Sequence, residues 1–335
     1  MSKRLKQVLN IVVFMGIGLG LTWLLYRSIT PEQRVSIADA IEHANYWLIL
    51  PAMVIGVFSH IFRAARWNII IEPMGYKPRL SNSFFSVMVG YLVNLGLPRV
   101  GEISRCAVLA RYEKIPAEKL IGTLIAERAV DVVCLLLLML ATVLSQLGLL
   151  SNLFYIHAWL PVQQKFANAN YVVYGVGIVA LLILVFILRL LFRKMLHSKL
   201  ALKIKAMARG VMDGLLAIGK MKNKWGFVMY TALIWLAYFS MLYCGFFCLP
   251  ATSGLGLKAA MAVLSMGSIA MIITPGGLGS YPYMVQITLS VYGIDEGMGI
   301  AFGGIIWAAQ TVLIITLGLI SFICLPIFNK ERKAA

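Results

Sequence analysis

The 335 residues are too apolar for a water-soluble fold. Hydrophobic residues make up 61% of the chain and charged residues 13%, and the mean hydropathy is +0.87. A soluble domain of this length cannot bury that much apolar surface, so lipid must be the solvent around much of the chain. The net charge of +17 comes largely from short basic loops, which makes nucleic-acid binding an unnecessary inference.

Eight apolar segments follow one another along the chain, and several approach the roughly 20 residues that a membrane-spanning helix needs. They lie at 8–26, 46–62, 83–97, 120–147, 171–192, 226–249, 258–292 and 300–328. The first is long for a signal-peptide core and is followed by no small-residue cleavage site, so we expect it to stay in the protein. These segments predict an all-α polytopic integral membrane protein, organised as a single transmembrane domain over residues 1–335.

The charges of the loops predict the orientation, because short cytoplasmic loops carry an excess of Lys and Arg. Both termini are placed inside by clusters of cations: Lys3, Arg4 and Lys6 at one end, and Lys330, Arg332 and Lys333 at the other. The more acidic stretch 27–45 is expected outside. After the second apolar segment we expect a cytoplasmic loop, since four cations follow it: Arg63, Arg66, Lys77 and Arg79.

The third apolar segment does not fit a simple crossing. If 83–97 spanned the membrane, the basic stretch 99–119 would lie outside, against the charge rule. We therefore predict that the chain enters from the cytoplasm, turns at the "GLP" of residues 96–98 and returns. Such a re-entrant hairpin is tolerated where protein or a water-filled cavity satisfies its broken backbone.

A second re-entrant hairpin is predicted for 258–292, which begins after an external loop, breaks at "TPGGLGSYP" and ends at the acidic "YGIDEG". With about six full spans and two oppositely inserted hairpins, all Lys and Arg residues are cytoplasmic except four: Arg27, Arg34, Lys165 and Lys258. Broken helices inserted from opposite sides suggest the inverted arrangement that secondary transporters build around a central site.

Residues 193–224 combine an apolar stripe with many Lys and Arg residues. The apolar positions follow a 4-4-3-4-4-3 spacing: Leu196, Leu200, Ile204, Met207, Val211, Leu215 and Ile218. That spacing predicts a basic amphipathic helix, which is suited to lie on an anionic cytoplasmic leaflet. An ordinary cytoplasmic loop whose apolar stripe packs on the helix bundle is the alternative.

The fourth apolar segment carries charges far from its ends. Starting a helix at Leu120, a rise of about 1.5 Å per residue puts Glu127 and Arg128 roughly 10–12 Å deep and Asp131 roughly 16 Å deep. Each unpaired charge at the bilayer centre costs at least about 2.5–3.5 kcal/mol. Glu127 and Asp131 share one face and repel, and Arg128 bridges at most to Asp131, so this helix needs partners from elsewhere.

The stretch "NLGLPRVGEISR", which begins at Asn94, is a candidate substrate-binding segment and supplies such partners. Arg99, Glu102 and Arg105 bring two positive charges and one negative, and the fourth segment brings one positive and two negative, so the six sum to zero. Docking the first hairpin on the fourth segment would pair them. The result is either a closed ion-pair lattice or a polar cavity whose arginines receive a phosphate bidentately, and we favour the cavity.

The second hairpin offers backbone and hydroxyl groups without charge. Three glycines permit close backbone approach: Gly276, Gly277 and Gly279. Pro282 sits where a helix would begin, so free N–H groups near Tyr281 and Tyr283 are expected to face an anion. An ordinary tight turn is the alternative.

No pattern of catalytic residues stands out. The sequence shows no Ser/His/Asp set, no Gly-rich phosphate loop with Lys and no metal-ligand spacing among His43, His60, His157 and His197. We therefore expect neither an enzyme activity nor a metal or cofactor.

Three motifs in order, "NLGLPRVGEISR", "ERAVD" and "TPGGLG", resemble the transmembrane domain of the lysylphosphatidylglycerol synthase family, a flippase-like domain that also occurs as a free-standing membrane protein. The resemblance implies a multi-pass protein of a bacterial or archaeal cytoplasmic membrane that binds or translocates a phospholipid or related amphiphile. It points to the residues named above: Arg99, Glu102, Arg105, Glu127, Arg128, Asp131 and the glycines of the second hairpin.

The chain departs from that family in two ways. Many relatives have an acidic residue shortly after the glycine turn, where this chain has "SYPY". The bifunctional synthases also carry a soluble catalytic domain after the membrane part, so we do not expect aminoacyl transfer by these 335 residues alone.

The leading hypothesis is a lipid translocase, or flippase-like transporter, for the anionic head group of a phospholipid or a polyprenyl-phosphate-linked glycolipid. The alternatives are a membrane-embedded lipid-modifying transferase, with Glu127 or Asp131 as base, and a non-transporting accessory subunit of an envelope glycosyltransferase. Expected partners are membrane lipids and the anionic leaflet, and a homo-oligomer or an envelope-biosynthesis partner is compatible with the sequence.

Overall fold

The computed structural model describes residues 16, 18–97, 100–148, 189 and 221–330. Within these ranges the chain forms helices and turns and no strand, so the predicted all-α class is confirmed. Among the described residues, three helical stretches are long and apolar enough to cross a membrane: Tyr46–Met74, Lys224–Phe246 and Glu296–Phe328. The total of about six spans stays a prediction.

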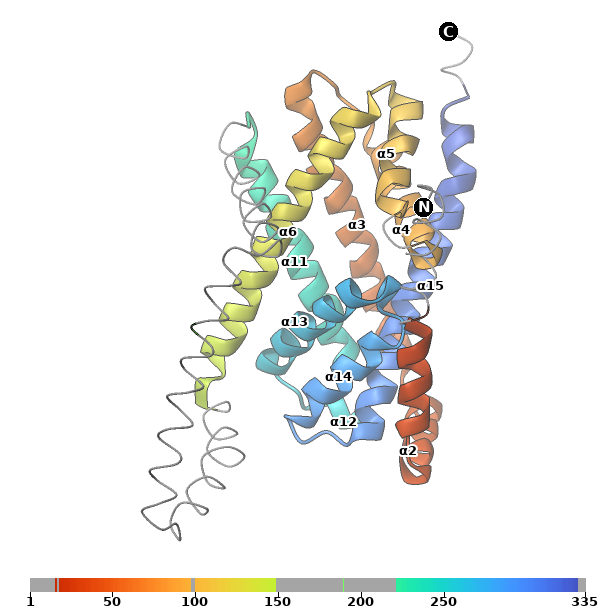
Figure 1. Ribbon diagram of the computed structural model, residues 1–335, viewed down its shortest axis with the longest axis vertical. Coiled ribbons are helices and arrows are strands. Elements are labelled where there is room, and N and C mark those ends of the chain that lie inside the picture. Colours follow the sequence, from red (N-terminus) through yellow and green to blue (C-terminus); the bar gives the residue numbers. More distant parts are fainter. Residues whose placement is uncertain (1–15, 17, 98–99, 149–188, 190–220, 331–335) are drawn as a thin grey trace.

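Four long helices form the frame of the molecule (Figure 1): α3 (Ile49–Ile71), α6 (Ala117–Ser145), α11 (Lys224–Phe246) and α15 (Glu296–Phe328). α11 packs along α3, and α15 contacts both hairpins described below. α6 has 29 residues, which gives it a length of about 43 Å. The predicted segments 120–147, 226–249 and 300–328 therefore correspond to α6, α11 and α15.

Both predicted breaks are present. α4 (Leu80–Gly96) turns back into α5 (Val100–Glu113), and α13 (Leu257–Ile273) turns through η4 (Pro275–Gly277) into α14 (Ser280–Ser290). Figure 1 shows the first hairpin in the upper half of the view and the second in the lower half, and α4 contacts η4 where the tips meet. Insertion of these hairpins from opposite sides of a membrane, and the inverted relationship between the halves, stay predictions.

The turn of the second hairpin depends on its glycines. Gly276, Gly277 and Gly279 have φ angles of 58°, 74° and 72°, in the left-handed region that disfavours residues with a Cβ. Space is also limited, because a Cβ on Gly277 would lie 2.6 Å from the sulfur of Met271. The "TPGG" motif therefore encodes a sharp reversal rather than a flexible loop.

The stretch 27–45, expected as an external loop, contains a helix, and its place outside the membrane stays a prediction. α2 (Pro31–Glu42) begins with a capping box in which Thr30 and Gln33 bond each other's backbone N–H groups. Gln33 also donates to Glu296 at 2.9 Å, which ties α2 to the start of α15. A polar segment forms a helix here because its caps and its contacts with α15 replace the missing apolar stripe.

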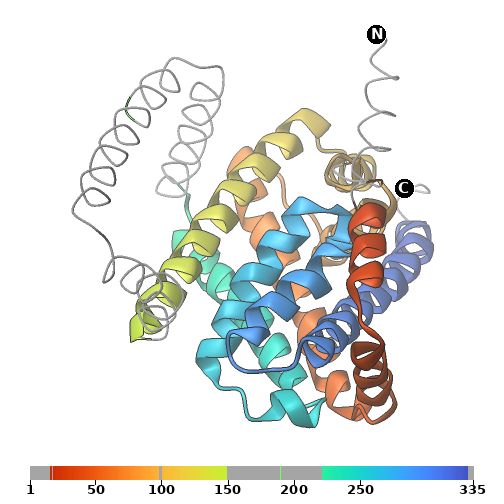
Figure 2. The same cartoon turned by 60° about the horizontal axis from the view of Figure 1, so that its bottom comes forward.

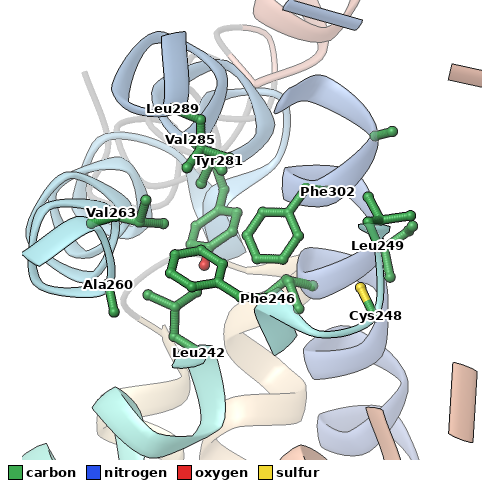
Figure 3. Packing of buried hydrophobic residues seen from close by; sticks show 14 of the residues in the cluster. Leu242, Phe246, Cys248, Leu249, Ala260, Val263, Tyr281, Val285, Leu289 and Phe302 are labelled. Carbon is green, nitrogen blue, oxygen red and sulfur yellow. The ribbon is translucent and has the colours of Figure 1, made fainter. Parts of the chain in front are cut away.

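The largest hydrophobic cluster joins the second hairpin to α11 and α15 (Figure 3). Phe246 and Phe302 are fully buried, with ring centroids 5.2 Å apart, and Tyr281 packs beside them. Figure 2 shows the second hairpin between α6 and α15, which agrees with the contacts of α13 with α6 and of α14 with α15. Burial of these rings fixes the lower half of the molecule.

A second cluster, centred on the fully buried Trp67, packs the first hairpin against α3 and α6. Several sequence-based predictions fall outside the described residues: Arg99, the apolar segment 171–192 apart from Arg189, and the amphipathic helix 193–224 apart from its last four residues.

Candidate functional site

Two arginines of α3 lie in the interior, which corrects the predicted cytoplasmic loop after residue 62. α3 continues to Ile71, and Arg63 and Arg66 are 4% and 0% exposed. A sequence signal for this placement exists, since the apolar run resumes at Trp67 and extends to Ile71. Two cations inside a continuing apolar helix indicate buried partners.

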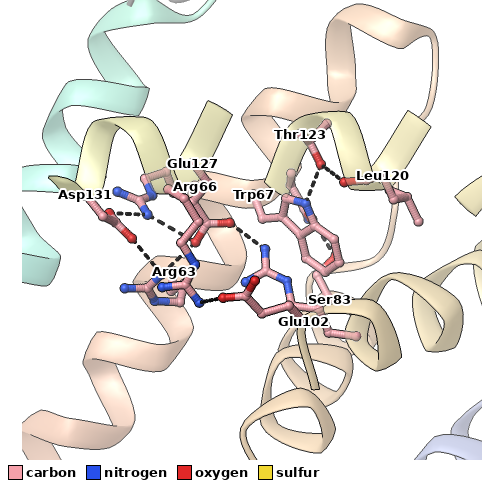
Figure 4. Close-up of polar contacts among 12 residues, drawn as sticks. Arg63, Arg66, Trp67, Ser83, Glu102, Leu120, Thr123, Glu127 and Asp131 are labelled. Atoms are coloured by element: carbon pink, nitrogen blue, oxygen red, sulfur yellow. Dashed lines mark hydrogen bonds and ion pairs between the residues drawn. The ribbon is translucent and has the colours of Figure 1, made fainter. Parts of the chain in front are cut away.

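Those partners are the two carboxylates of α6 (Figure 4). Glu127 Oε1 lies 2.7 Å from Arg63 and 3.1 Å from Arg66, while Asp131 lies 3.0 Å from Arg63 and 2.8 Å from Arg66. Each arginine therefore bridges both acids, which removes the repulsion expected between Glu127 and Asp131 one turn apart.

The first hairpin adds a third arginine to the same cluster. Arg105 of α5 donates to the second oxygen of Glu127, and its guanidinium lies 4.1 Å from the ring centroid of Trp67. Trp67 in turn donates to Thr123 of α6 at 2.8 Å. Glu127 is fully buried and contacts three arginines, so its charge is compensated from two other helices.

Arg128 and Glu102 form a separate pair between α6 and α5 at 2.8 Å. Their side chains are 40% and 32% exposed, in contrast to the buried cluster around Glu127. The bridge that the i+3 spacing allows from Arg128 to Asp131 is not formed, because Asp131 pairs with Arg63 and Arg66 instead. The predicted docking of the first hairpin on α6 is confirmed by the pairs of Glu102 and Arg105.

The charge count differs from the expected neutral set of six. Among the described residues, four arginines meet three carboxylates: Arg63, Arg66, Arg105 and Arg128 against Glu102, Glu127 and Asp131. This set carries one surplus positive charge. The neutral sum fails because α3 contributes two arginines that the local sequence pattern assigns to a loop.

A cavity of about 540 Å³ opens beside these charges. One part of its wall is charged and is formed by Arg63, Glu102, Arg128 and Asp131. The remainder is largely apolar, with side chains such as Val132, Leu135, Met241, Leu264, Met271, Ile272, Ile306 and Ile314. A volume in this range is typical of a small-molecule or head-group site.

The second hairpin contributes part of the cavity wall. Gly276 and Tyr281 line it, whereas Gly277 and Gly279 build the turn and Tyr283 lies outside the lining with 43% exposure. The helix expected near Pro282 begins at Ser280. Its start is covered, because a Cβ on Gly279 would lie 2.6 Å from Thr22 Oγ1.

Asn94 lines the cavity from the tip of the first hairpin. Its Oδ1 accepts a hydrogen bond from the backbone N–H of Gly101 at 2.9 Å, so it also fastens α4 to α5. A Cβ on Gly101 would lie 2.0 Å from the carbonyl oxygen of Gly90. The close approach of the two limbs therefore requires glycine at this position.

Several lining residues had no distinctive sequence signal. Tyr238 of α11 accepts a hydrogen bond from Arg63 at 3.0 Å, and His60, Tyr91 and Trp235 also face the cavity. Aromatic residues are common in apolar helices, so only the packing of α11 and α4 on α3 identifies these residues as part of the cavity lining. Across the described ranges, no three metal-ligating side chains cluster closely enough to hold an ion.

Comparison with known proteins identifies the family. The model of the lysylphosphatidylglycerol synthase TM region matches residues 7–318. A UPF0104 membrane protein of Methanocaldococcus jannaschii is 28% identical over 98 residues, an alignment that covers 28% of this chain and only 29% of that relative. No solved structure matches the chain. Because the family model covers most of its length, the chain belongs to the lysylphosphatidylglycerol synthase TM region family.

Proposed function

We propose that the protein binds the phosphate-bearing head group of a membrane lipid in this cavity and moves that lipid between leaflets. The observation that carries the proposal is the cavity itself, which joins one charged wall to a largely apolar remainder. A lipid has the same division, since its head group requires polar partners while its acyl chains favour apolar ones.

The surplus positive charge favours an anionic ligand. Buried charges are costly unless they are paired, and the four arginines outnumber the three carboxylates of the described site. A phosphate diester brings the missing negative charge and accepts two hydrogen bonds from one guanidinium. Binding would therefore complete the neutralisation of the site.

The arginines divide into two groups with different roles. Arg66 and Arg105 are buried, pair with Glu127 and do not line the cavity. We assign these two arginines a structural role, because they hold α3, α5 and α6 together. Arg128 lines the cavity, keeps a half-exposed side chain and has a single carboxylate partner.

Arg128 is accordingly the proposed phosphate ligand, with Arg63 as second donor. Among the described residues the Nε atoms of both have no hydrogen-bond partner, as is also true of Arg66 and Arg105, although a guanidinium offers five N–H groups; lining of the cavity is what distinguishes Arg128 and Arg63. The carboxylate of Glu102 pairs with the guanidinium of Arg128. If a phosphate replaced that carboxylate, Arg128 would still be paired with a negative charge.

A reconstituted-liposome assay with fluorescent phospholipids tests the proposal. We expect the wild type to move labelled lipid between leaflets and Arg128→Ala to lose most of this activity. Arg111→Ala is the control, since Arg111 lies on the neighbouring helix α5, is exposed and does not line this cavity.

The outcomes separate the competing functions. Equal lipid movement by wild type and Arg128→Ala overturns the role of Arg128. A covalently altered lipid in mass spectra of the purified reaction identifies a transferase. Neither movement nor bound lipid, together with a stable envelope-enzyme partner, identifies an accessory subunit.

A further inference from the structure

A second cavity, of about 440 Å³, lies where α5 and α15 end, and it shares no lining residue with the cavity beside the charge cluster. Arg111 and Lys114 line it at the end of α5, and Ile327 and Lys330 line it at the end of α15. Both helix ends lie in the upper half of the view in Figure 1. The second cavity is therefore separate from the proposed lipid path.

A buried polar network joins the two helix ends at this cavity. Asn82 of α4 and Asn329, directly after α15, exchange two hydrogen bonds through their side-chain amides, at 3.0 and 2.9 Å. Asn82 also donates to Glu113, the last residue of α5, at 2.6 Å. Asn329 is 8% exposed and lines the cavity. Because such satisfied networks are rigid, the ends of three helices hold the cavity wall in place.

Three cations and no carboxylate line this cavity: Arg111, Lys114 and Lys330. None of the ion pairs within the described part of the chain includes any of them. The C-terminal ends of α5 and α15 each contribute roughly half a negative charge, and Glu113 beside the cavity contributes one more. The three cations still exceed these negative charges, so the cavity favours an anion.

The backbone of Lys114 supports a role for its charge. Its φ of 55° is the one positive φ outside glycine among the described residues. A left-handed conformation is unfavourable for a residue with a Cβ, and glycine or asparagine is usual directly after a helix in this conformation. Helix termination alone would favour those residues, whereas lysine adds a cation to the cavity wall.

The apolar side of the cavity indicates that the anion belongs to a lipid. Ile327 and the adjacent Phe328 are 60% and 61% exposed. They form the end of α15, which is long and apolar enough to cross a membrane, so the cavity is expected at the level of the lipid head groups. Basic pockets between membrane helices bind anionic head groups at this level. A free phosphate would contact the cations but leave the apolar side unused.

We infer that this cavity is a second lipid-binding site, which takes the phosphate of an anionic membrane lipid. Lys114 and Lys330 bind the phosphate oxygens from the ends of two helices, and Ile327 contacts the start of an acyl chain. Arg111, whose guanidinium lies 6.0 Å from the ring centroid of Tyr112, adds positive potential. The site is distinct from the central cavity and does not rest on the proposed function.

Native mass spectrometry of the full chain in phosphatidylcholine nanodiscs, titrated with phosphatidic acid, tests this inference. The double variant Lys114→Asn, Lys330→Gln removes both charges, and asparagine suits the left-handed backbone at position 114. Each lysine near an anionic lipid contributes about 1 kcal/mol. We therefore expect roughly 30-fold weaker binding at this site, because about 1.4 kcal/mol corresponds to tenfold.

The double variant Lys222→Gln, Lys224→Gln is the matched control. It removes two exposed lysines at the start of α11, which also lies in the upper half of Figure 1, and neither lysine lines a cavity described above. We expect this control to bind phosphatidic acid like the wild type at physiological ionic strength, since exposed charges are screened. An equal loss in both double variants overturns the site and assigns the binding to general surface charge.

Combination with Arg128→Ala separates this inference from the proposed function. We expect the Lys114→Asn, Lys330→Gln variant to lose one bound phosphatidic acid both with and without Arg128→Ala. A loss in Arg128→Ala alone overturns the second site and supports the central one. A loss in the lysine variant alone overturns the role of Arg128 and supports the second site. Inorganic phosphate that binds the wild type as tightly as phosphatidic acid does, and fails to bind the lysine variant, overturns the lipid as ligand.

Discussion

The first hairpin, α4–α5, and the second, α13–α14, meet at their tips but depend on different interactions. The first carries Glu102 and Arg105, which pair with α6. The second has no charged residue between Ala259 and Ser290, and close contacts at its glycines fix its turn.

The comparison shows two ways to stabilise a broken helix in apolar surroundings. Ion pairs place the first hairpin, so its position depends on the number and sign of nearby charges. Shape and hydrogen bonds from side chains to the backbone place the second, where the hydroxyl of Ser280 donates to the carbonyl of Ala270 at 2.9 Å. A change of charge should therefore damage the first, and an added methyl group the second.

The largest expected effect is at the centre of the charge cluster. Glu127→Ala leaves three buried arginines short of a counter-ion, so we expect a loss of about 3–5 kcal/mol in the free energy of unfolding. Denaturant titration of the purified protein in detergent measures it. Glu118→Ala, on the exposed first turn of the same helix, is the control and should remain near wild type. Equal stability of the two variants would contradict the proposed role of the cluster.

The second hairpin should respond to one methyl group. In Gly279→Ala the new Cβ meets Thr22, with 2.7 Å to its backbone nitrogen, at a φ of 72°. We expect a loss of about 1–3 kcal/mol, the range for a residue in a strained backbone conformation. Gly254→Ala is the control, since its φ is −81° and no atom lies within 4 Å of the new Cβ. A tolerated Gly279→Ala would show that the turn adapts freely.

A smaller effect is expected from the bond that joins α15 to the second hairpin. Trp307→Phe removes the N–H that donates to Gly276, at a cost of about 0.5–1.5 kcal/mol in unfolding free energy. Trp235→Phe is the matched substitution, because the N–H it removes has no partner in the part of the chain that the structure describes. The same assay should show lower stability for Trp307→Phe alone, and an equal loss in both variants would assign the effect to ring size.

The smallest effect on stability is expected at Arg128. Its pair with Glu102 is partly exposed, and such pairs contribute only about 0–1 kcal/mol. Arg128→Ala should therefore unfold near the wild-type denaturant concentration while losing lipid binding. Arg105→Ala, which removes a buried partner of Glu127, should lose stability instead. A reversed pattern would exchange the structural and ligand-binding roles of these arginines.

The two breaks were predictable from residue type alone. The "GLP" and "TPGG" stretches interrupt apolar runs, and glycine and proline end helices for local steric reasons. The pairing of "NLGLPRVGEISR" with "ERAVD" also followed from charge, because unpaired charges in an apolar segment require partners. Local composition therefore identified α5 and α6 as neighbours.

The roles of Arg63 and Arg66 were missed, because the loop rule was given more weight than the apolar run that resumes at Trp67. An arginine after an apolar run is typical of a cytoplasmic loop, and its burial depends on a carboxylate from another helix. Tyr281 and Tyr283 show the same limit, since they are two residues apart but only Tyr281 lines the cavity. Which face of α14 is covered depends on α13 and α15.

The sequence by itself determined the membrane class, the helical content, the positions of the two hairpins and the need to neutralise Glu127 and Asp131. These properties follow from composition, chain breaks and the cost of unpaired charge. Only the tertiary structure decided which cations meet those carboxylates, and that Arg128 alone among the α6 and α5 arginines lines the cavity. Ion pairs form between helices that are far apart in the sequence, and local sequence patterns do not show which helices pack together.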